Sequence, residues 1–217
     1  MVTVPQVTET IIKRSRYLTE AFAKGIINSS ALAKYIKPEI EKMLIKKTSQ
    51  SSIIMAINRL KNRIKPNINY KNIFKTQPEI AIRSRLSLVT LVNSDTLYES
   101  CSTFFQVHPI KKRHFLTLTE GLSETTMIIS DSLKKEILLY LQKETIISDI
   151  DNLSSITIYL PEEAARSPGV IYSFLKSLVW ENVNIIEIVS TSRELTLVFQ
   201  DEDINKAFSI LKSLFTV

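Results

Sequence analysis

Polar and basic side chains gather along one side of segment 48–64. They are Ser51, Ser52, Asn58, Arg59, Asn62 and Arg63. Small hydroxyls, amides and guanidinium groups are the side chains that hydrogen-bond to the phosphate oxygens and base edges of DNA. Ile53, Ile57 and Leu60 recur at helical spacing on the other side, where they would form an apolar face. The pattern predicts a DNA-contacting helix whose arginines bind backbone phosphates and whose asparagines read base edges.

This segment resembles the recognition helix of winged or tri-helical helix-turn-helix domains, with Pro38–Leu44 as the preceding helix. The glycine that is common in the turn between two such helices is absent, and Ile45-Lys46-Lys47 stands in its place. A plain three-helix domain with an exposed polar face accounts for the same residues. The sequence leaves both interpretations open.

The side chains from which enzymes build catalytic sites are scarce. Only three glycines occur in the 217 residues, and they form no phosphate-binding loop. The lone Cys101 excludes a disulfide framework and a cysteine-based zinc site, and His108 and His114 are the only imidazoles. We therefore expect a protein that is not an enzyme and that holds no cofactor and no metal. No apolar stretch is long enough to span a bilayer, so we expect a cytoplasmic protein without a membrane partner.

Charge divides the chain into a basic and an acidic part. Residues 1–85 hold 17 Lys and Arg against five Asp and Glu, whereas the remaining 132 residues hold 11 basic and 17 acidic side chains. A basic surface concentrates a polyanion near it and releases counterions when it binds phosphates. A solvated lysine-rich surface would give the same count. The asymmetry therefore permits a nucleic-acid-binding N-terminal module and does not require one.

The N-terminal module is expected to be helical. Apolar positions over 6–24 share one helical stripe, and Gly25 follows where a helix would end. Asn28 or Ser29 would cap a second, short helix. Pro38 would end that helix and begin the next, because proline breaks a helix interior but suits a first turn.

The C-terminal part carries one pattern twice, at a spacing of about 70 residues. Each copy reads as a strand, a helix, two strands and a helix. In the first copy these segments are 86–92, 95–106, 114–119, 125–130 and 132–142. In the second copy they are 155–160, 168–181, 184–189, 194–199 and 203–213. This order predicts antiparallel sheets of ferredoxin-like type, each with a bare face or edge that must pair with the other unit or with a second chain.

The fold class that follows is α+β. A basic helical domain, helix-turn-helix or winged-helix-like, is expected over 1–66, and two ferredoxin-like βαββα units are expected over 85–145 and 153–217. The segment between them, 67–84, is polar, basic and interrupted by proline, which is typical of a linker or of a wing-like hairpin.

Three runs of the second unit carry a recognisable pattern: Ser167–Leu175, Glu181–Ser192 and Glu194–Phe199. They resemble an ACT domain, most closely the tandem pair that forms the regulatory C-terminus of aspartokinases. The resemblance covers the second unit well and the first only in outline, because Asn93-Ser94-Asp95-Thr96 stands where the second unit has Pro-Gly. The aspartokinase catalytic domain is missing, so the resemblance implies a regulator without kinase activity.

The resemblance also implies an amino-acid site. In ACT domains such a site is lined by the strand-to-helix loop around the glycine and by the Asn-Ile pair that enters the second strand. Here these positions are Ser167, Pro168, Gly169, Val170, Asn184 and Ile185. Free N–H groups at a helix N-terminus favour a carboxylate, and glycine lets it come close. The Asn184 amide can serve both the carboxylate and the ammonium group of an amino acid.

Two functions remain in view. We expect a non-catalytic, amino-acid-sensing regulator in which the ACT pair binds a small amino-acid effector, forms a homodimer and controls a DNA-binding head. The alternative is an interaction module that docks on a metabolic enzyme such as an aspartokinase and regulates it. The first requires salt-dependent binding to DNA, and the second requires an acidic surface on a partner protein.

Overall fold

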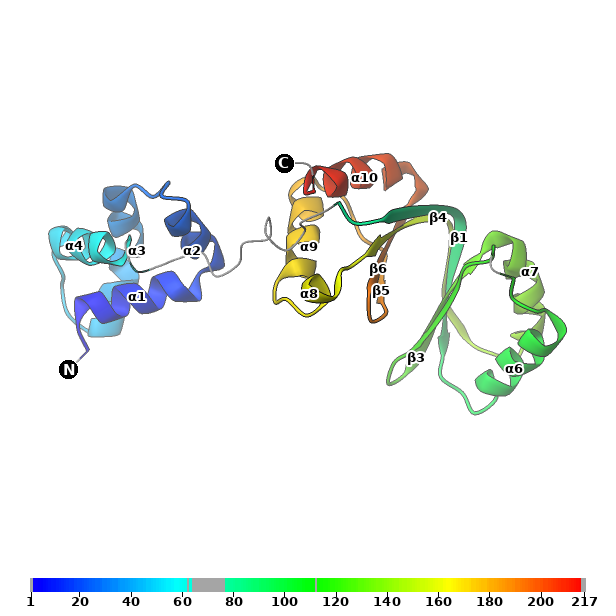
Figure 1. Ribbon diagram of the computed structural model, residues 1–217. Coiled ribbons are helices and arrows are strands. Elements are labelled where there is room, and N and C mark those ends of the chain that lie inside the picture. The colour runs from blue at the N-terminus through cyan, green and yellow to red at the C-terminus, as the bar shows by residue number, and fades with distance from the viewer. Residues whose placement is uncertain (1, 62, 64–76, 112, 216–217) are drawn as a thin grey trace. The chain divides into compact units, whose positions relative to one another are not determined.

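The chain folds into two compact units, Met1–Asn69 and Tyr70–Val217 (Figure 1). The computed structural model describes residues 2–61, 63, 77–111 and 113–215. Over these residues the first unit is built from helices, and the second combines helices with strands.

Four helices build the described part of the N-terminal unit: α1 (Val4–Arg14), α2 (Arg16–Ala23), α3 (Ser29–Leu44) and α4 (Gln50–Lys61). Their apolar faces meet in one core that includes Ile12 and Ile36, which are 0% and 2% exposed. The apolar face predicted for α4 is confirmed for Ile53, Ile57 and Leu60, which are all buried in this core. The opposite side of α4 is therefore left to solvent.

The prediction of a single helix over 6–24 is wrong, because Ser15 separates two helices, α1 and α2. Ser15 has an extended backbone (φ −94°, ψ 111°), and its Oγ accepts a hydrogen bond from the Leu18 N–H at 3.5 Å. A serine in this position caps the helix that follows it. The apolar stripe still holds, since Leu18 and Phe22 are buried in the same core as α1. Gly25 follows α2 with a φ of 69°, which confirms its expected place after a helix end.

The helix boundary expected at Pro38 is also wrong, because α3 continues through it. Proline removes one backbone hydrogen bond. Ile36 before it and Ile40 after it nevertheless both pack into the core, at 2% and 0% exposure. A continuous helix keeps the two halves of this apolar stripe on one face. The start of α3 is confirmed, since Asn28 Oδ1 accepts hydrogen bonds from two N–H groups of the first turn at 3.0 and 3.1 Å.

The C-terminal unit contains the strand–helix–strand–strand–helix order twice. The first repeat consists of β1 (Ile80–Val92), α6 (Leu97–Val107), β2 (Leu116–Glu120), β3 (Glu124–Ser130) and α7 (Asp131–Tyr140). The second repeat consists of β4 (Ile146–Tyr159), the short α8 (Glu162–Ala165), α9 (Val170–Trp180), β5 (Glu187–Ser190), β6 (Glu194–Gln200), a 3₁₀ turn (Asp201–Asp203) and α10 (Ile204–Ser213). Helices at the N-terminus and antiparallel strands beyond them make the chain α+β, as expected.

The two repeats share one six-stranded antiparallel sheet in the order β2-β3-β1-β4-β6-β5. Its central strands, β1 and β4, have 13 and 14 residues and pair along most of their length. The first half of β1 pairs with the second half of β4, for example Ile80 with Ile158. The second half of β1 pairs with β3 from Leu86 onward, and β4 pairs with β6 from Leu153 onward. Each long strand therefore serves both repeats.

The shared strands bend where they pass from one repeat to the other (Figure 1). Arg85 in β1 and Asn152 in β4 have positive φ angles of 59° and 57°. The pairing register also shifts between Arg83 and Leu86 and again between Leu86 and Leu88. Irregularities of this kind increase the local bend of a strand. As a result, each helix pair covers the outer face of its own half of the sheet.

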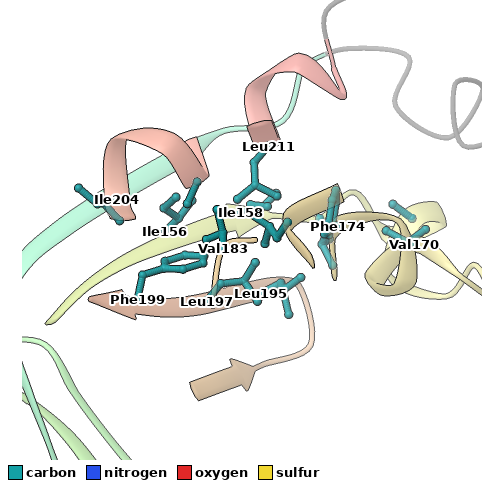
Figure 2. Close-up of a cluster of buried hydrophobic side chains, with 14 residues drawn as sticks. Ile156, Ile158, Val170, Phe174, Val183, Leu195, Leu197, Phe199, Ile204 and Leu211 are labelled. Carbon is teal, nitrogen blue, oxygen red and sulfur yellow. The ribbon is translucent and has the colours of Figure 1, made fainter. Parts of the chain in front are cut away.

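Three apolar clusters stabilise this unit. In the second repeat, β4 and β6 pack against α9 and α10 around Phe174, Leu197 and Phe199 (Figure 2). In the first repeat, β1 and β3 pack against α6 and α7 around Phe104. A third cluster joins side chains from the helix-free faces of both repeats; its fully buried members are Leu86, Leu88, Ile128, Leu153 and Val198. The bare faces expected from the sequence thus cover each other within one chain.

The strands extend further than the sequence pattern indicates. Residues 80–84 belong to β1, although they fall in the segment 67–84 that was expected to be a linker or wing, and residues 67–76 lie outside the described part of the chain. Residues 146–154 likewise belong to β4, ahead of the expected strand start. These extensions are largely exposed, so they lack the apolar run that marks a buried strand.

Candidate functional site

The turn into α9 leaves the start of this helix open. Gly169 takes the left-handed conformation (φ 87°, ψ 1°) that glycine adopts without steric cost, and Val170 anchors the first turn in the core at 2% exposure. The first N–H groups of a helix have no acceptor within it. Over the described residues, no side chain caps α9 and no acidic residue lies in its first turn. This end can therefore receive a carboxylate from outside.

The other sequence-predicted ligand residues divide into two places. Pro168 and Ser167 precede α9, and the Ser167 hydroxyl donates to the Glu163 carbonyl at 2.5 Å. Asn184 and Ile185 lie beyond the other end of α9, where Asn184 is exposed. A helix of 11 residues is about 16 Å long. The structure therefore does not bring the glycine loop and the Asn-Ile pair together within one repeat.

The corresponding loop of the first repeat is filled by a side chain of the same chain. The carboxylate of Glu144 accepts hydrogen bonds from the hydroxyls of Ser94 at 2.5 Å and Thr96 at 2.8 Å, directly before α6. The Ser100 hydroxyl donates to it at 3.4 Å, and Ser94 Oγ accepts from the Leu97 N–H at 3.1 Å. A carboxylate held at a helix N-terminus is stabilising. No local sequence pattern marks Glu144, because it lies about fifty residues away along the chain from its partners.

A series of polar contacts runs from the α9 loop to the start of β1. Glu162 in α8 pairs with Arg166 at 3.1 Å and with Arg193 at 2.9 Å. Arg193 also donates to the hydroxyl of Tyr159 at 3.1 Å, and the Tyr159 N–H donates to the Glu79 carbonyl at 3.0 Å. The hydrogen bond to Tyr159 is the largest effect raising the pKa of Arg193. Glu79 directly precedes β1, so these contacts link α8 and the residue that follows it to the start of β1.

The residues predicted to contact DNA lie mostly on the solvent side of the N-terminal unit. Ser51, Asn58, Arg59 and Arg63 are exposed, Ser52 is half-buried, and Asn62 lies outside the described residues. The Asn58 Oδ1 accepts a hydrogen bond from the Ser29 hydroxyl at 2.7 Å, which fixes its amide group against the start of α3. Its NH₂ group remains a donor on the exposed side.

Other chemistry-bearing groups are structural. Cys101 lies on the buried side of α6, and burial raises the pKa of its thiol, which makes it a poor nucleophile. Within the described part of the chain, no three His, Cys, Asp or Glu side chains are placed to hold a metal ion. Nor does any helix there have the length and apolar character needed to cross a membrane.

No protein-family model matches the sequence, and no curated protein does. Solved structures do match. A chain from the crystal structure of the aspartokinase alpha and beta subunits has a TM-score of 0.53 at 13% identity, over 65% of this chain and 100% of that one. The regulatory subunit of aspartate kinase from Thermus flavus has a TM-score of 0.52 at 11% identity, over 64% of this chain and 99% of its own. The part of the chain that these structures cover, about two thirds, has the fold of aspartokinase regulatory domains.

The same fold forms part of a longer enzyme. The aspartate kinase of Clostridium acetobutylicum, described as an allosteric enzyme, matches with a TM-score of 0.55 at 15% identity, over 70% of this chain and 37% of the kinase. Across these structures the chain thus spans nearly all of a separate regulatory subunit but little more than a third of a whole kinase. These matches agree with the coarser part of the expectation, an α+β fold similar to aspartokinase regulatory domains.

Proposed function

We propose that the chain is a non-catalytic regulator whose second repeat binds a free amino acid and thereby controls the N-terminal basic unit. The open N-terminus of α9, preceded by Gly169 in an aspartokinase-type regulatory fold, is the observation that carries this proposal. The carboxylate of the effector would accept hydrogen bonds from the first N–H groups of α9, where the helix dipole also favours a negative charge.

A second copy of the chain completes the site. Because Gly169 and Asn184 lie at opposite ends of α9, one amino acid cannot contact both within a repeat. Two repeats packed in opposite directions would bring the glycine loop of one copy to Asn184 and Ile185 of the other. The sheet also ends in two edge strands, β2 and β5, which can pair with another chain. The regulator is therefore proposed to act as a homodimer with shared effector sites.

The output is proposed to be DNA binding through the exposed side of α4. Arg59 and Arg63 would bind phosphates, and Asn58 and Asn62 would contact base edges, with the hydroxyls of Ser51 and Ser52 at the start of the helix. The excess of basic residues over 1–85 supports a polyanionic partner. Effector binding would act on the contacts from Arg166 to Glu79 and so on the entry of β1, changing how two heads fit two half-sites.

A second candidate function is docking on a metabolic enzyme. Ile45 and Met55 support it, because these apolar side chains on the N-terminal unit are 93% and 57% exposed. Exposed apolar groups among basic residues are typical of a surface that meets an acidic protein partner. This candidate keeps the amino-acid site and changes only what the N-terminal unit recognises.

Two measurements on the full chain test the proposal. The first records the melting temperature with each free amino acid in turn, since a ligand that binds only the folded state raises it. The second measures affinity for random-sequence duplex DNA across a salt series, with and without the stabilising amino acid. Salt-steep binding that the amino acid changes supports the regulator. Amino-acid binding without DNA binding at low salt favours enzyme docking, and no amino-acid binding contradicts both.

A further inference from the structure

The N-terminal unit has a hollow between the start of α1 and the turn from α3 to α4. Its volume is about 620 Å³. Its lining residues are Val2, Thr3, Val4, Met43, Leu44, Lys46, Lys47, Thr48, Ser49 and Ser52. The lining thus contains two ammonium groups and four hydroxyls and no carboxylate. Only Ser52 among these residues belongs to the surface predicted for DNA contact.

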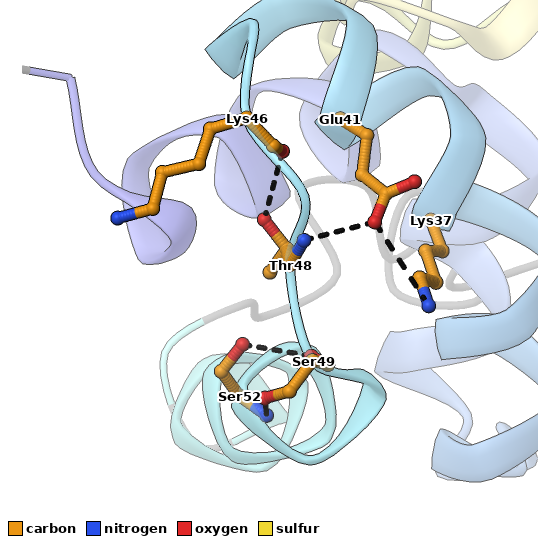
Figure 3. A network of polar contacts seen from close by, with 6 residues as sticks. All are labelled: Lys37, Glu41, Lys46, Thr48, Ser49 and Ser52. Atoms are coloured by element: carbon orange, nitrogen blue, oxygen red, sulfur yellow. Dashed lines mark hydrogen bonds and ion pairs between the residues drawn. The ribbon is translucent and has the colours of Figure 1, made fainter.

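The two lysines of the hollow are not neutralised by neighbouring acids. Among the described contacts, neither Lys46 nor Lys47 forms an ion pair, and both residues are exposed. The nearby Glu41 carboxylate accepts a hydrogen bond from the N–H of Thr48, itself a lining residue, at 2.8 Å, but it is paired with Lys37, whose ammonium group lies 3.9 Å away. Figure 3 shows the Lys46 side chain extending away from Glu41. The hollow therefore carries an uncompensated positive charge.

Helix α4 begins at the hollow, and the N–H groups of its first turn add hydrogen-bond donors with partial positive charge. Ser49 precedes α4, and its Oγ accepts a hydrogen bond from the Ser52 N–H at 3.2 Å, while the Ser52 hydroxyl donates to the Ser49 carbonyl at 2.8 Å (Figure 3). The N–H groups of Gln50 and Ser51 have no acceptor within the helix, because they belong to its first turn. Neither α1 nor α4 has an acidic residue in its first turn. A negative charge is absent where helix ends usually attract one.

We infer that this hollow binds a phosphate group, with Lys46 and Lys47 as its cationic ligands and the first turn of α4 as its N–H donors. Phosphate matches the lining because its oxygens accept several charge-assisted hydrogen bonds at once. The cavity is large enough for a phosphate that belongs to a longer backbone, so the phosphodiester of DNA and free phosphate are the two sources of this chemistry. The inference rests on the proposed function only in naming DNA as one source.

The test is a titration of the ¹⁵N-labelled full chain with inorganic phosphate against chloride at constant ionic strength. The amide signals of Gln50 and Ser51 are expected to shift and saturate. Lys46→Gln combined with Lys47→Gln is expected to weaken binding about tenfold through the loss of charge-assisted hydrogen bonds. Lys34→Gln, a change of an exposed lysine of α3 outside the hollow, is the matched control and should leave binding within about twofold.

A parallel titration with a short duplex DNA distinguishes the sources. If the double variant weakens both titrations, the hollow is a site for a DNA phosphate. If it weakens only the phosphate titration, the site takes free phosphate and DNA binds elsewhere on the chain. Absence of DNA binding by the wild type would contradict the proposed DNA function and leave the phosphate site standing. Shifts that do not saturate, or equal shifts in the double variant and the wild type, would overturn the inference.

Discussion

The two repeats of the C-terminal unit share one sheet and the same strand–helix–strand–strand–helix order, yet they differ in the loop that precedes α6 in the first and α9 in the second. In the first repeat, Glu144 holds the hydroxyls before α6 with a carboxylate from the same chain. In the second repeat, Gly169 precedes α9, and the N-terminus of α9 has neither a side-chain cap nor an acidic residue in its first turn. One copy of the fold is thus closed by its own side chain, and the other can receive a carboxylate from solution.

The largest effect is expected from Gly169→Val, which places a β-branched residue at a φ of 87°. The strained backbone would cost about 1–2 kcal/mol, and the side chain would block the helix start. The amino-acid-induced rise in melting temperature should disappear. Gly121→Ala, in the β2–β3 turn of the first repeat, is the control and should keep the response. A response that survives Gly169→Val would place the site elsewhere.

Glu144→Ala should open the first repeat and make it resemble the second. The loss of three hydrogen bonds to a carboxylate, the one from Ser100 being long, is expected to lower the free energy of unfolding by about 1–2 kcal/mol, measured with urea. Acetate should recover part of this loss by entering the vacated place, and it should have no such effect on the wild type. Glu124→Ala, a change of an exposed strand residue, serves as the control. Unchanged stability would show that the carboxylate does not close the first repeat.

A smaller effect is expected from the charge network that ties α7 to β4 in the first repeat. Hydrogen bonds from Lys134 and then from Ser87 lower the pKa of Asp151 below its ordinary value of 3.8. A lowered folded-state pKa stabilises the fold above the ordinary value, and this stability is lost as the pH falls through the lowered value.

Lys134→Met should therefore flatten the dependence of unfolding free energy on pH in the acid range. Lys135→Met, a change of the exposed neighbouring lysine, should leave that dependence unchanged. Urea unfolding at a series of pH values measures both. If the two variants gave the same profile as the wild type, the network would not link α7 to β4 energetically.

The smallest effect concerns the contacts between the α9 loop and β1. Tyr159→Phe removes the hydroxyl that Arg193 reaches at 3.1 Å, but it leaves the loop itself intact. Effector affinity should stay within about twofold, whereas the factor by which effector changes DNA affinity should fall about fivefold. Tyr98→Phe, in α6 of the first repeat, is the matched control. If effector changes DNA affinity by the same factor in both variants, these contacts do not transmit the proposed signal.

The local periodicity of the sequence was enough to predict most elements. Ile53, Ile57 and Leu60 repeat at helical spacing and are buried as expected. Periodicity alone would mislead at Ile171, which lies at helical spacing from the buried Phe174 and yet is 43% exposed. The stripe of α9 is narrower than the apolar character of its sequence indicates, since the helix has apolar residues on its solvent side as well.

What the sequence could not predict depends on partners that are distant along the chain. The first half of β1 is largely exposed and lacks a buried apolar run, so it is recognisable as a strand only through its pairing with β4. Glu144 likewise becomes significant only when the fold brings it to Ser94 and Thr96. Local patterns find helices and core strands, whereas shared strands and side chains that fill a distant loop follow from tertiary packing.

The number of effector molecules bound per chain tests the comparison of the repeats most directly. The measurement is isothermal titration of the full chain with the amino acid that raises its melting temperature. Because Glu144 closes the first repeat and the second is open, a single amino-acid molecule per chain is expected, and Glu144→Ala should leave that site in place. Two equivalent molecules per wild-type chain, or none for any amino acid, would contradict the account.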